Sequence, residues 1–482
     1  MSVSRNKSIF IVFIDMLQIC ATLCMYLVDT KNYNVMFIFG TAVFVILLFS
    51  WIIDTGQIVN YFSILIVLIY LYTLGQYLLY YFNINIKFQY NIENIYEPKQ
   101  INRAVLYVLI NTIILHLSTI IFTNQRKKFK SEYVSSSEEQ NAFLTASIIL
   151  VNLSFVCKLI VLLFKIRLNL RYGYSVALGT SYNGAGPFSH IINFGATLFL
   201  PSIFAALVAT KNKKYNFIFW IYYAIFVIAY FLSGSRFEAV ISIAGLVLLY
   251  HFYYHKITIK QFILIGIIGV CVLFLCSLFN SIRIITNYGQ TTDFAEIFSR
   301  SIQSTKNNNF LFDVIATTGF QILSVTNVLI HCPSSQPFSY GLYYLGGLIR
   351  IIPNIFGGHN ILITESIDGI FTPYLTRTYG MGSSFIAEAY YNFGYFGFIV
   401  MIFYGYLIAF VCSKMNNIRK GQTKNIILIY FVFYMAAETL FWVRSDARML
   451  LREIVFYYIG FKIFTKIVQG ILKRKGKKTC EV

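Results

Sequence analysis

Apolar runs of about 18 to 23 residues, separated by short polar stretches, recur along almost the whole of this chain. A helix of that length crosses the roughly 30 Å of hydrocarbon in a lipid bilayer. Open strand edges would leave backbone groups without partners in lipid, and the runs are too long for the alternating strands of an outer-membrane barrel. The pattern therefore predicts an all-α polytopic membrane protein.

Composition supports the same class. The 482 residues are 57% hydrophobic and 12% charged, whereas about a quarter of the residues of a soluble domain are charged. We expect about twelve transmembrane helices, near residues 9–28, 35–53, 61–82, 104–122, 142–164, 191–210, 217–233, 239–254, 262–279, 393–413, 426–443 and 450–468. The first run lacks a small-residue cleavage site, so we interpret it as an uncleaved anchor.

Basic residues in short loops set the expected orientation, because such loops stay in the cytoplasm. Alternate loops carry RKKFK at 126–130, KNKK at 211–214, and a group that includes Lys414 and Lys420. The amino-terminal Arg5 and the tail KRKGKK at 473–478 have the same parity. Both termini are therefore predicted to be cytoplasmic.

This orientation divides the chain into three regions. Residues 1–279 form nine helices with short loops, including an external loop at 165–190. Residues 280–392 form one large external loop with short amphipathic helices. Residues 393–482 form the last three helices and the basic cytoplasmic tail.

Arginine is enriched on the outer side, where the topology rule disfavours it. The guanidinium is a planar, permanently charged fork that suits phosphate. The alternative is that outer acids such as Asp446 neutralise these residues. The outer arginines are Arg103, Arg167, Arg171, Arg236, Arg283, Arg300, Arg350, Arg377, Arg444 and Arg448.

Outer tyrosines offer flat faces on which sugars stack. We take Tyr174, Tyr379 and Tyr391 as candidate sugar-binding residues. Tyrosine is also an ordinary residue of the membrane interface, which is the alternative interpretation for each of them.

Three stretches combine ionisable residues with glycines. LSGSRFE at 232–238 places Arg236 and Glu238 at membrane depth, where a functional role is the default and a structural pair is the alternative. LGGLIRIIPNIFGGHN at 345–360 carries Arg350 and His359, a candidate proton carrier or a solvated loop histidine.

The third stretch, YLTRTYGMGSSFIAEAYYNFGYFGF at 374–398, carries Arg377 and Glu388. A carboxylate beside apolar residues is a candidate general base. Pairing of Glu388 with Arg377 on a helix surface is the alternative. The sequence contains no GxxxxGK[ST] or HExxH motif, and the eight cysteines form no CxxC pair, so we expect no cofactor and no metal.

These motifs resemble the Wzy-type oligosaccharide repeat unit polymerases of O-antigen and capsule assembly. The similar patterns are SGSR at a span end, Arg-x-x-Pro in the large loop, and G-x-G-S-S-x-x-A-E-x-Y-x-N-F-G-x-x-G from Gly380. The resemblance implies a multi-pass protein of the bacterial cytoplasmic membrane. Its activity would be that of a glycosyltransferase that joins undecaprenyl pyrophosphate-linked repeat units at the outer face, without nucleotide or metal.

The resemblance also implies roles for the residues above. Arg236, Arg350, Arg377 and Glu388 would be catalytic. Arg167, Arg171, Arg283, Arg444 and Arg448 would bind pyrophosphate. Expected partners are the lipid-linked glycan, membrane lipid, a flippase and a chain-length regulator, with no nucleic acid.

Two other functions compete with polymerase. A lipid-linked oligosaccharide flippase has a similar number of spans, but its loops are usually short. An O-antigen ligase shares the large loop and the arginines and differs in its acceptor, which is lipid A core instead of a glycan. A dolichol-type glycosyltransferase would carry acids in a large first outer loop, and here that loop holds only Asp29.

Overall fold

The computed structural model describes residues 2–57, 59–87, 91–126, 134–172, 180–211, 214–233, 236–258, 260–261, 264–271, 274–275, 278, 294–307, 309–349, 366–374 and 382–479. Throughout these residues the regular elements are helices and no strand occurs, which confirms the all-α class. The predictions at Tyr174, Arg283, Arg350, His359, Arg377 and Tyr379 lie outside the described residues.

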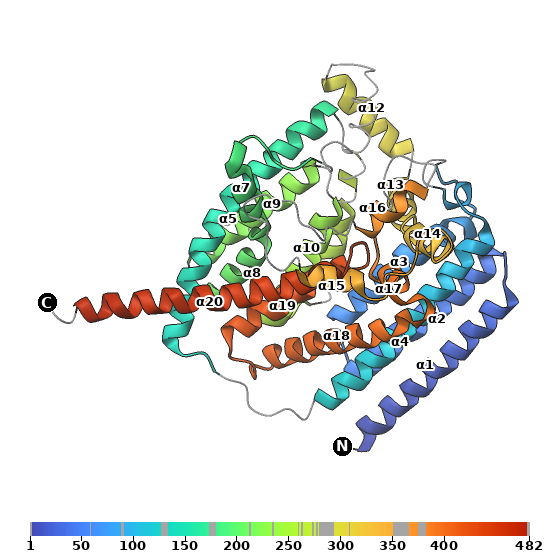
Figure 1. Ribbon diagram of the computed structural model, residues 1–482, viewed down its shortest axis with the longest axis horizontal. Coiled ribbons are helices and arrows are strands. Elements are labelled where there is room, and N and C mark those ends of the chain that lie inside the picture. Colours follow the sequence, from blue (N-terminus) through green and yellow to red (C-terminus); the bar gives the residue numbers. More distant parts are fainter. Residues whose placement is uncertain are drawn as a thin grey trace.

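The amino-terminal half is a series of long helices joined by short connections (Figure 1). Asparagine side chains begin α2 and α3, because Asn32 and Asn60 accept hydrogen bonds from backbone N–H groups of the first turn. The elements are α1 (Ser2–Val28), α2 (Tyr33–Thr55), α3 (Tyr61–Tyr81), η2 (Ile92–Asn94), α4 (Pro98–Arg126), α5 (Ser137–Tyr172), η3 (Gly186–Phe188), α7 (Ser189–Thr197), α8 (Phe199–Ala209), α9 (Asn216–Ser233), α10 (Arg236–Leu249) and the π-helical η4 (Tyr250–Tyr254).

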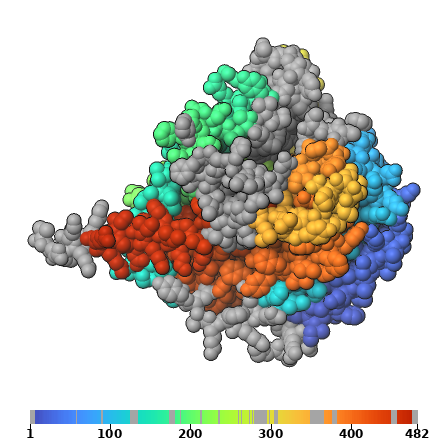
Figure 2. Space-filling model, viewed as in Figure 1, coloured from blue at the N-terminus to red at the C-terminus, as the bar shows by residue number. Residues whose placement is uncertain are grey.

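Shorter helices follow before the chain returns to long ones. These elements are α12 (Phe294–Asn307), α13 (Phe310–Gly319), α14 (Ile322–His331), α15 (Leu342–Ile349), α16 (Ile367–Phe371), η5 (Thr372–Tyr374), α17 (Phe385–Phe393), η6 (Gly394–Gly397), α18 (Phe398–Arg419), α19 (Ile426–Phe441) and α20 (Arg448–Thr479). The carboxyl-terminal part of α20 projects from the body of the molecule (Figures 1 and 2).

Nine helical stretches among the described residues are long and apolar enough to cross a membrane. Eight of them coincide with expected spans. The expected span at 191–210 is the helix pair α7 and α8, bent by 44°, and α19 is a shorter apolar helix. A multi-pass membrane protein is therefore supported, while the number of twelve spans stays a prediction.

The ninth stretch, Phe310–His331, lies in the region expected to be one large external loop. Hydropathy alone did not single it out, because Asp313 and several Thr, Gln and Ser residues interrupt its apolar residues. The structure packs its two helices, α13 and α14, against α3 and α4. A Cβ atom on Gly319 would lie 2.4 Å from the backbone nitrogen of Gln76, so the absence of a side chain lets α13 and α3 approach closely, as small residues do in membranes.

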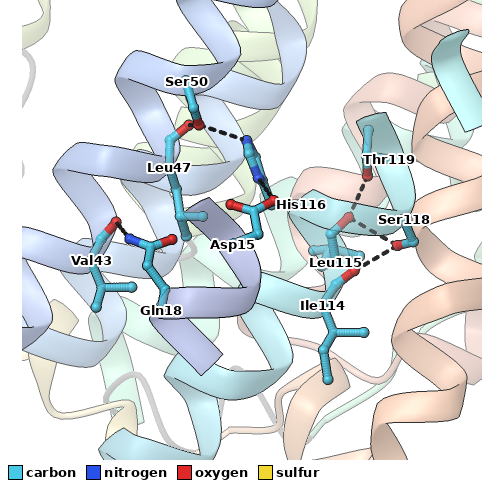
Figure 3. A network of polar contacts seen from close by, with 10 residues as sticks. All are labelled: Asp15, Gln18, Val43, Leu47, Ser50, Ile114, Leu115, His116, Ser118 and Thr119. Atoms are coloured by element: carbon cyan, nitrogen blue, oxygen red, sulfur yellow. Dashed lines mark hydrogen bonds and ion pairs between the residues drawn. The ribbon is translucent and has the colours of Figure 1, made fainter. Parts of the chain in front are cut away.

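A buried polar network ties α1 and α2 to α4 (Figure 3). The His116 Nδ1–H donates to the Asp15 carboxylate at 2.8 Å, and His116 Nε2 lies 3.1 Å from the Ser50 hydroxyl. Asp15 and His116 are both 0% exposed. An unpaired ionisable group at such depth would be strongly unfavourable, so this pairing fixes the position of α1.

The order Ser50, His116, Asp15 matches that of a nucleophilic triad. The Ser50 hydroxyl, however, donates to the backbone carbonyl of Leu47 at 2.9 Å, and the side chain is buried. A nucleophile needs access to a substrate. We therefore interpret the network as a structural tie between helices.

Replacing one member of this tie tests that interpretation. We expect Asp15→Leu to lower the free energy of unfolding by about 3–5 kcal/mol, because it removes the carboxylate that pairs with the buried His116. The double variant Asp15→Leu/His116→Phe removes both polar groups and should recover most of the loss. Thermal unfolding of the purified variants in detergent measures both effects. A single variant as stable as the wild type would contradict the tie.

Candidate active site

The turn between α19 and α20 carries two arginines and one acid in five residues, Arg444 to Arg448. We call this turn the arginine corner. The Arg444 side chain is exposed, whereas Arg448 is 2% exposed and Asp446 is 7% exposed. The two guanidinium groups therefore lie in different environments, and each meets a different set of helices.

Arg448 is held by an aromatic ring and a carboxylate. Its guanidinium carbon lies 3.8 Å from the centre of the Tyr343 ring, and its Nε lies 3.5 Å from Asp446 Oδ2. The Tyr343 hydroxyl donates to Asp446 and accepts from the backbone N–H of Ile367. Burial and the neighbouring Asp446 carboxylate raise the pKa of Tyr343 far above its usual value, so the phenol stays a neutral donor.

Close backbone packing brings α15 to the same place. A Cβ atom on Gly347 would lie 2.8 Å from the backbone oxygen of Arg448. Glycine at this position therefore lets α15 lie directly against the start of α20, with Tyr343 on the same helix facing Arg448.

Glu388 on α17 is hydrogen-bonded to the backbone of the arginine corner. Its carboxylate accepts two backbone hydrogen bonds, from Ala447 N–H at 2.6 Å and from Arg448 N–H at 2.9 Å. Glu388 is 0% exposed. The first N–H groups of a helix have no partner within it, and a carboxylate there is stabilised by the helix dipole. Glu388 is thus the N-terminal acceptor of α20 and not an acid on a helix surface.

Arg444 points to a second set of helices. Its guanidinium lies 5.4 Å from the centre of the Phe237 ring on α10. Phe237 also contacts the rings of Tyr72 and Phe441 edge-on. The LSGSRFE motif, whose residues from Arg236 onward begin α10, therefore meets the arginine corner through Phe237.

A polar contact joins α5 to α9. The Lys158 ammonium on α5 donates to the Tyr230 hydroxyl on α9 at 2.7 Å. Its nitrogen lies 4.9 Å from the centre of the same ring. We call Lys158 and Tyr230 the Lys158 centre.

The other described site candidates lie apart from the arginine corner or support it. Arg167 and Arg171 are exposed near the end of α5. Tyr391 is buried and contacts Tyr343 edge-on at 5.6 Å. Arg236 is the first residue of α10, and its side chain is outside the described atoms.

Two other arginines are paired with outer acids, which is the alternative to phosphate binding. Arg103 binds Asp29, which Lys99 also contacts, and Arg300 binds Glu296. The nearby Lys99 and Arg103 hold the pKa of Asp29 below its usual range. These exposed pairs leave Arg103 and Arg300 neutralised and distant in sequence from the arginine corner.

Sequence reasoning did not identify Tyr343, Asp446 or Lys158 as parts of a site. Asp446 was noted only as a possible partner of outer arginines. Its position between Arg444 and Arg448 was the one local signal, because alternating charges in a short turn are unusual beside apolar helices. In the described part of the chain, no three His, Cys, Asp or Glu side chains gather in a way that could hold a metal ion.

Comparison with known families assigns the chain to a protein family. The family model of the O-antigen polysaccharide polymerase Wzy matches residues 8–475. The chain belongs to the Wzy family. No curated protein and no solved structure matches it. As a Wzy family member, the chain is a multi-pass membrane protein with the general role of an O-antigen polymerase, and its substrate is a lipid-linked glycan.

Glutamine at position 388 tests how the Wzy arginine corner is held. The glutamine side chain would offer one acceptor oxygen and one NH₂ group, so one of the two N–H groups at the start of α20 would lose its acceptor. We expect Glu388→Gln to lower the free energy of unfolding by about 1–3 kcal/mol.

The exposed acid Glu93 supplies the matched control. Glu93→Gln should leave the unfolding temperature unchanged, and both variants are compared in one detergent by thermal unfolding. Equal stability of Glu388→Gln and the wild type would contradict the role of Glu388 as the acceptor for α20.

Proposed function

We propose that this chain joins undecaprenyl pyrophosphate-linked oligosaccharide repeat units into O-antigen or capsular polysaccharide. The growing chain is transferred from its lipid carrier to the non-reducing end of a new lipid-linked unit. The reaction takes place at the outer face of the cytoplasmic membrane and uses neither nucleotide nor metal. This proposal rests on the exposed guanidinium of Arg444, which lies beside Phe237 of α10. Arg448 and Asp446 of the same turn are buried and paired with each other.

In this proposal Arg444 binds the pyrophosphate of the donor. An exposed arginine whose ring contacts fix its direction can place its fork on phosphate oxygens, and it gains more as charge develops on the leaving group. Arg448 has the opposite role, because Tyr343 and Asp446 already occupy it. Arg448 stabilises the conformation of the arginine corner. Glu388 stabilises it too, through its hydrogen bonds to the start of α20.

Further outer residues complete the proposed site. Arg236, Arg350 and Arg377 belong to the motifs that resemble the family's, and we propose that they contact pyrophosphate together with Arg167, Arg171 and Arg283. Tyr174 and Tyr379 seat sugars, whereas Tyr391 supports Tyr343. His359 carries a proton. A flippase would supply the substrate and a chain-length regulator would limit the product.

The proposed orientation places the arginine corner outside. Both termini are cytoplasmic and the chain crosses the membrane about twelve times. α19 then runs outward from the basic group that includes Lys420 and Lys424, and α20 runs back to the basic tail. Basic residues at the inner ends of both helices support this arrangement.

Alanine at position 444 tests the role of the exposed arginine. In proteoliposomes supplied with lipid-linked repeat units, we expect Arg444→Ala to slow polymer formation by about 10²–10³-fold, as expected when a group that stabilises developing charge is removed. The rate of Arg444→Lys should lie between those of the wild type and Arg444→Ala, because lysine keeps the positive charge but lacks the planar guanidinium. Polymer is measured as a ladder on a gel.

Two arginines provide controls for this experiment. Arg300→Ala should leave the rate unchanged, because Arg300 is exposed and paired with Glu296. Arg448→Ala should lower the unfolding temperature, which separates loss of structure from loss of chemistry. A normal ladder from Arg444→Ala would reject the proposed role.

Deletion of the gene separates the competing functions. Single lipid-linked repeat units accumulating on the outer side would support a polymerase, whereas accumulation on the inner side would indicate a flippase. For a ligase, polymer would still form on the lipid carrier and fail to reach lipid A core.

A further inference from the structure

A cavity of about 120 Å³ lies between α5, α19 and α20, well away from the arginine corner. Ser136 and Glu139 line it at the start of α5, Ile427 at the start of α19, and Lys462 and Lys466 on α20. At 1.5 Å per residue, the nearer lysine lies about 21 Å along α20 from the first residue of that helix. One water molecule needs roughly 10–15 Å³ of such space, so the cavity has room for a larger group.

Contacts between the three elements hold the walls of the cavity together. α20 crosses α5 near the beginning of α5 (Figure 1), where Val468 packs against Ala142 and Ala146. The backbone N–H of Ile426, the first residue of α19, donates to the Ser135 hydroxyl just before α5 at 3.2 Å. The cavity is therefore a product of tertiary packing and not a groove along a single helix.

The lining of the cavity carries an excess of positive charge. Lys462 and Lys466 are exposed and four residues apart on α20, so their side chains lie on the same helix face and repel each other. Within the described part of the chain neither forms an ion pair, whereas Lys473 nearby is paired with Glu138 at 2.9 Å. Two lysines against the single acid Glu139 leave one positive charge, which a monoanion would balance.

Apolar side chains border the lysine face of α20. Ile463 and Ile467 directly follow the two lysines and are exposed. Consecutive residues of an α-helix are about 100° apart, so these isoleucines flank the lysines. On a membrane-spanning helix exposed isoleucines meet acyl chains, while a lysine keeps its ammonium in the polar layer. The lysines and isoleucines together therefore match the boundary between phospholipid headgroups and acyl chains.

We propose that this cavity binds the phosphate of a membrane phospholipid through Lys462 and Lys466, with the acyl chains along Ile463 and Ile467. In the proposed orientation the starts of α5 and α19 face the cytoplasm, so the lipid belongs to the inner leaflet. Basic pockets between membrane helices on that side bind anionic headgroups. The Ser136 hydroxyl accepts from the backbone N–H at position 139 at 3.2 Å and can donate its own proton to a phosphate oxygen. The site does not depend on the proposed polymerase reaction.

Lipid titration of the purified full chain tests the site, with dioleoyl phosphatidylglycerol in mixed detergent micelles as the probe. Native mass spectrometry counts the lipids that stay bound and yields a Kd. We expect Lys462→Gln/Lys466→Gln to raise the Kd by about 10-fold or more, because each lysine near an anionic headgroup contributes to binding. Lys462→Arg/Lys466→Arg should stay within about three-fold of the wild type, since arginine keeps the charge and also binds phosphate.

Lys256 and Lys260 supply the matched control. They are also exposed and four residues apart, they lie on the cytoplasmic side in the proposed orientation, and neither lines this cavity. Lys256→Gln/Lys260→Gln removes the same charge and should leave the Kd unchanged. An equal rise of the Kd in both glutamine double variants would indicate a general attraction between lipid and basic surface and would overturn the site. An unchanged Kd in Lys462→Gln/Lys466→Gln would overturn it too.

Glycerol 1-phosphate distinguishes a lipid from a free phosphate. It lacks acyl chains, so we expect it to displace phosphatidylglycerol only at concentrations at least about 100-fold higher. Displacement at equal concentration would identify a free phosphate as the occupant and would overturn the proposal. If thermal unfolding shows that the glutamine double variant does not fold, the single variants Lys462→Gln and Lys466→Gln decide. A higher Kd in either supports the site, and an unchanged Kd in both overturns it.

Discussion

The hydrogen bonds from the start of α20 to the Glu388 carboxylate join α17 to the turn that carries both arginines. The N–H groups at a helix start need acceptors, and inside a membrane protein water supplies few. Glu388 meets that need and so fixes the place at which α20 begins. Arg448 then packs on Tyr343, and Arg444 is left pointing toward α10. The turn that carries the exposed Arg444 is thus held by the buried Glu388 side chain.

The same rule governs the other ionisable groups at membrane depth. Asp15 is paired with His116, and the Lys158 ammonium donates to the Tyr230 hydroxyl. Burial without a partner would be strongly unfavourable, so each of these groups joins helices that are distant in sequence. Asp15 and His116 are fully enclosed. We therefore assign a structural role to that network.

The outer arginines have different environments in the structure. From sequence alone, the outer arginines were candidates for phosphate contacts that outer acids could instead neutralise. In the structure Arg103 and Arg300 are paired with surface acids, Arg448 is a structural cation, and Arg444 is open to a ligand. Pairing, burial and ring contacts separate these roles. In the proposed site, Arg448 therefore supports the arginine corner and Arg444 is free to bind the substrate.

Hydropathy by itself determined the helical class and the positions of eight of the nine candidate spans, and local motifs led to the Wzy family, because these depend on residues close in sequence. It could not determine that Phe310–His331 is an apolar helical stretch packed on α3, since Gly75 and Gly319 meet only when both helices are placed. Glu388 was correctly selected as a residue of interest, yet its contacts with Ala447 and Arg448 join positions about sixty residues apart. Such contacts leave no local pattern. The sequence therefore determined which helical segments are apolar enough to cross a membrane, and only the tertiary structure decided which of their polar groups are paired.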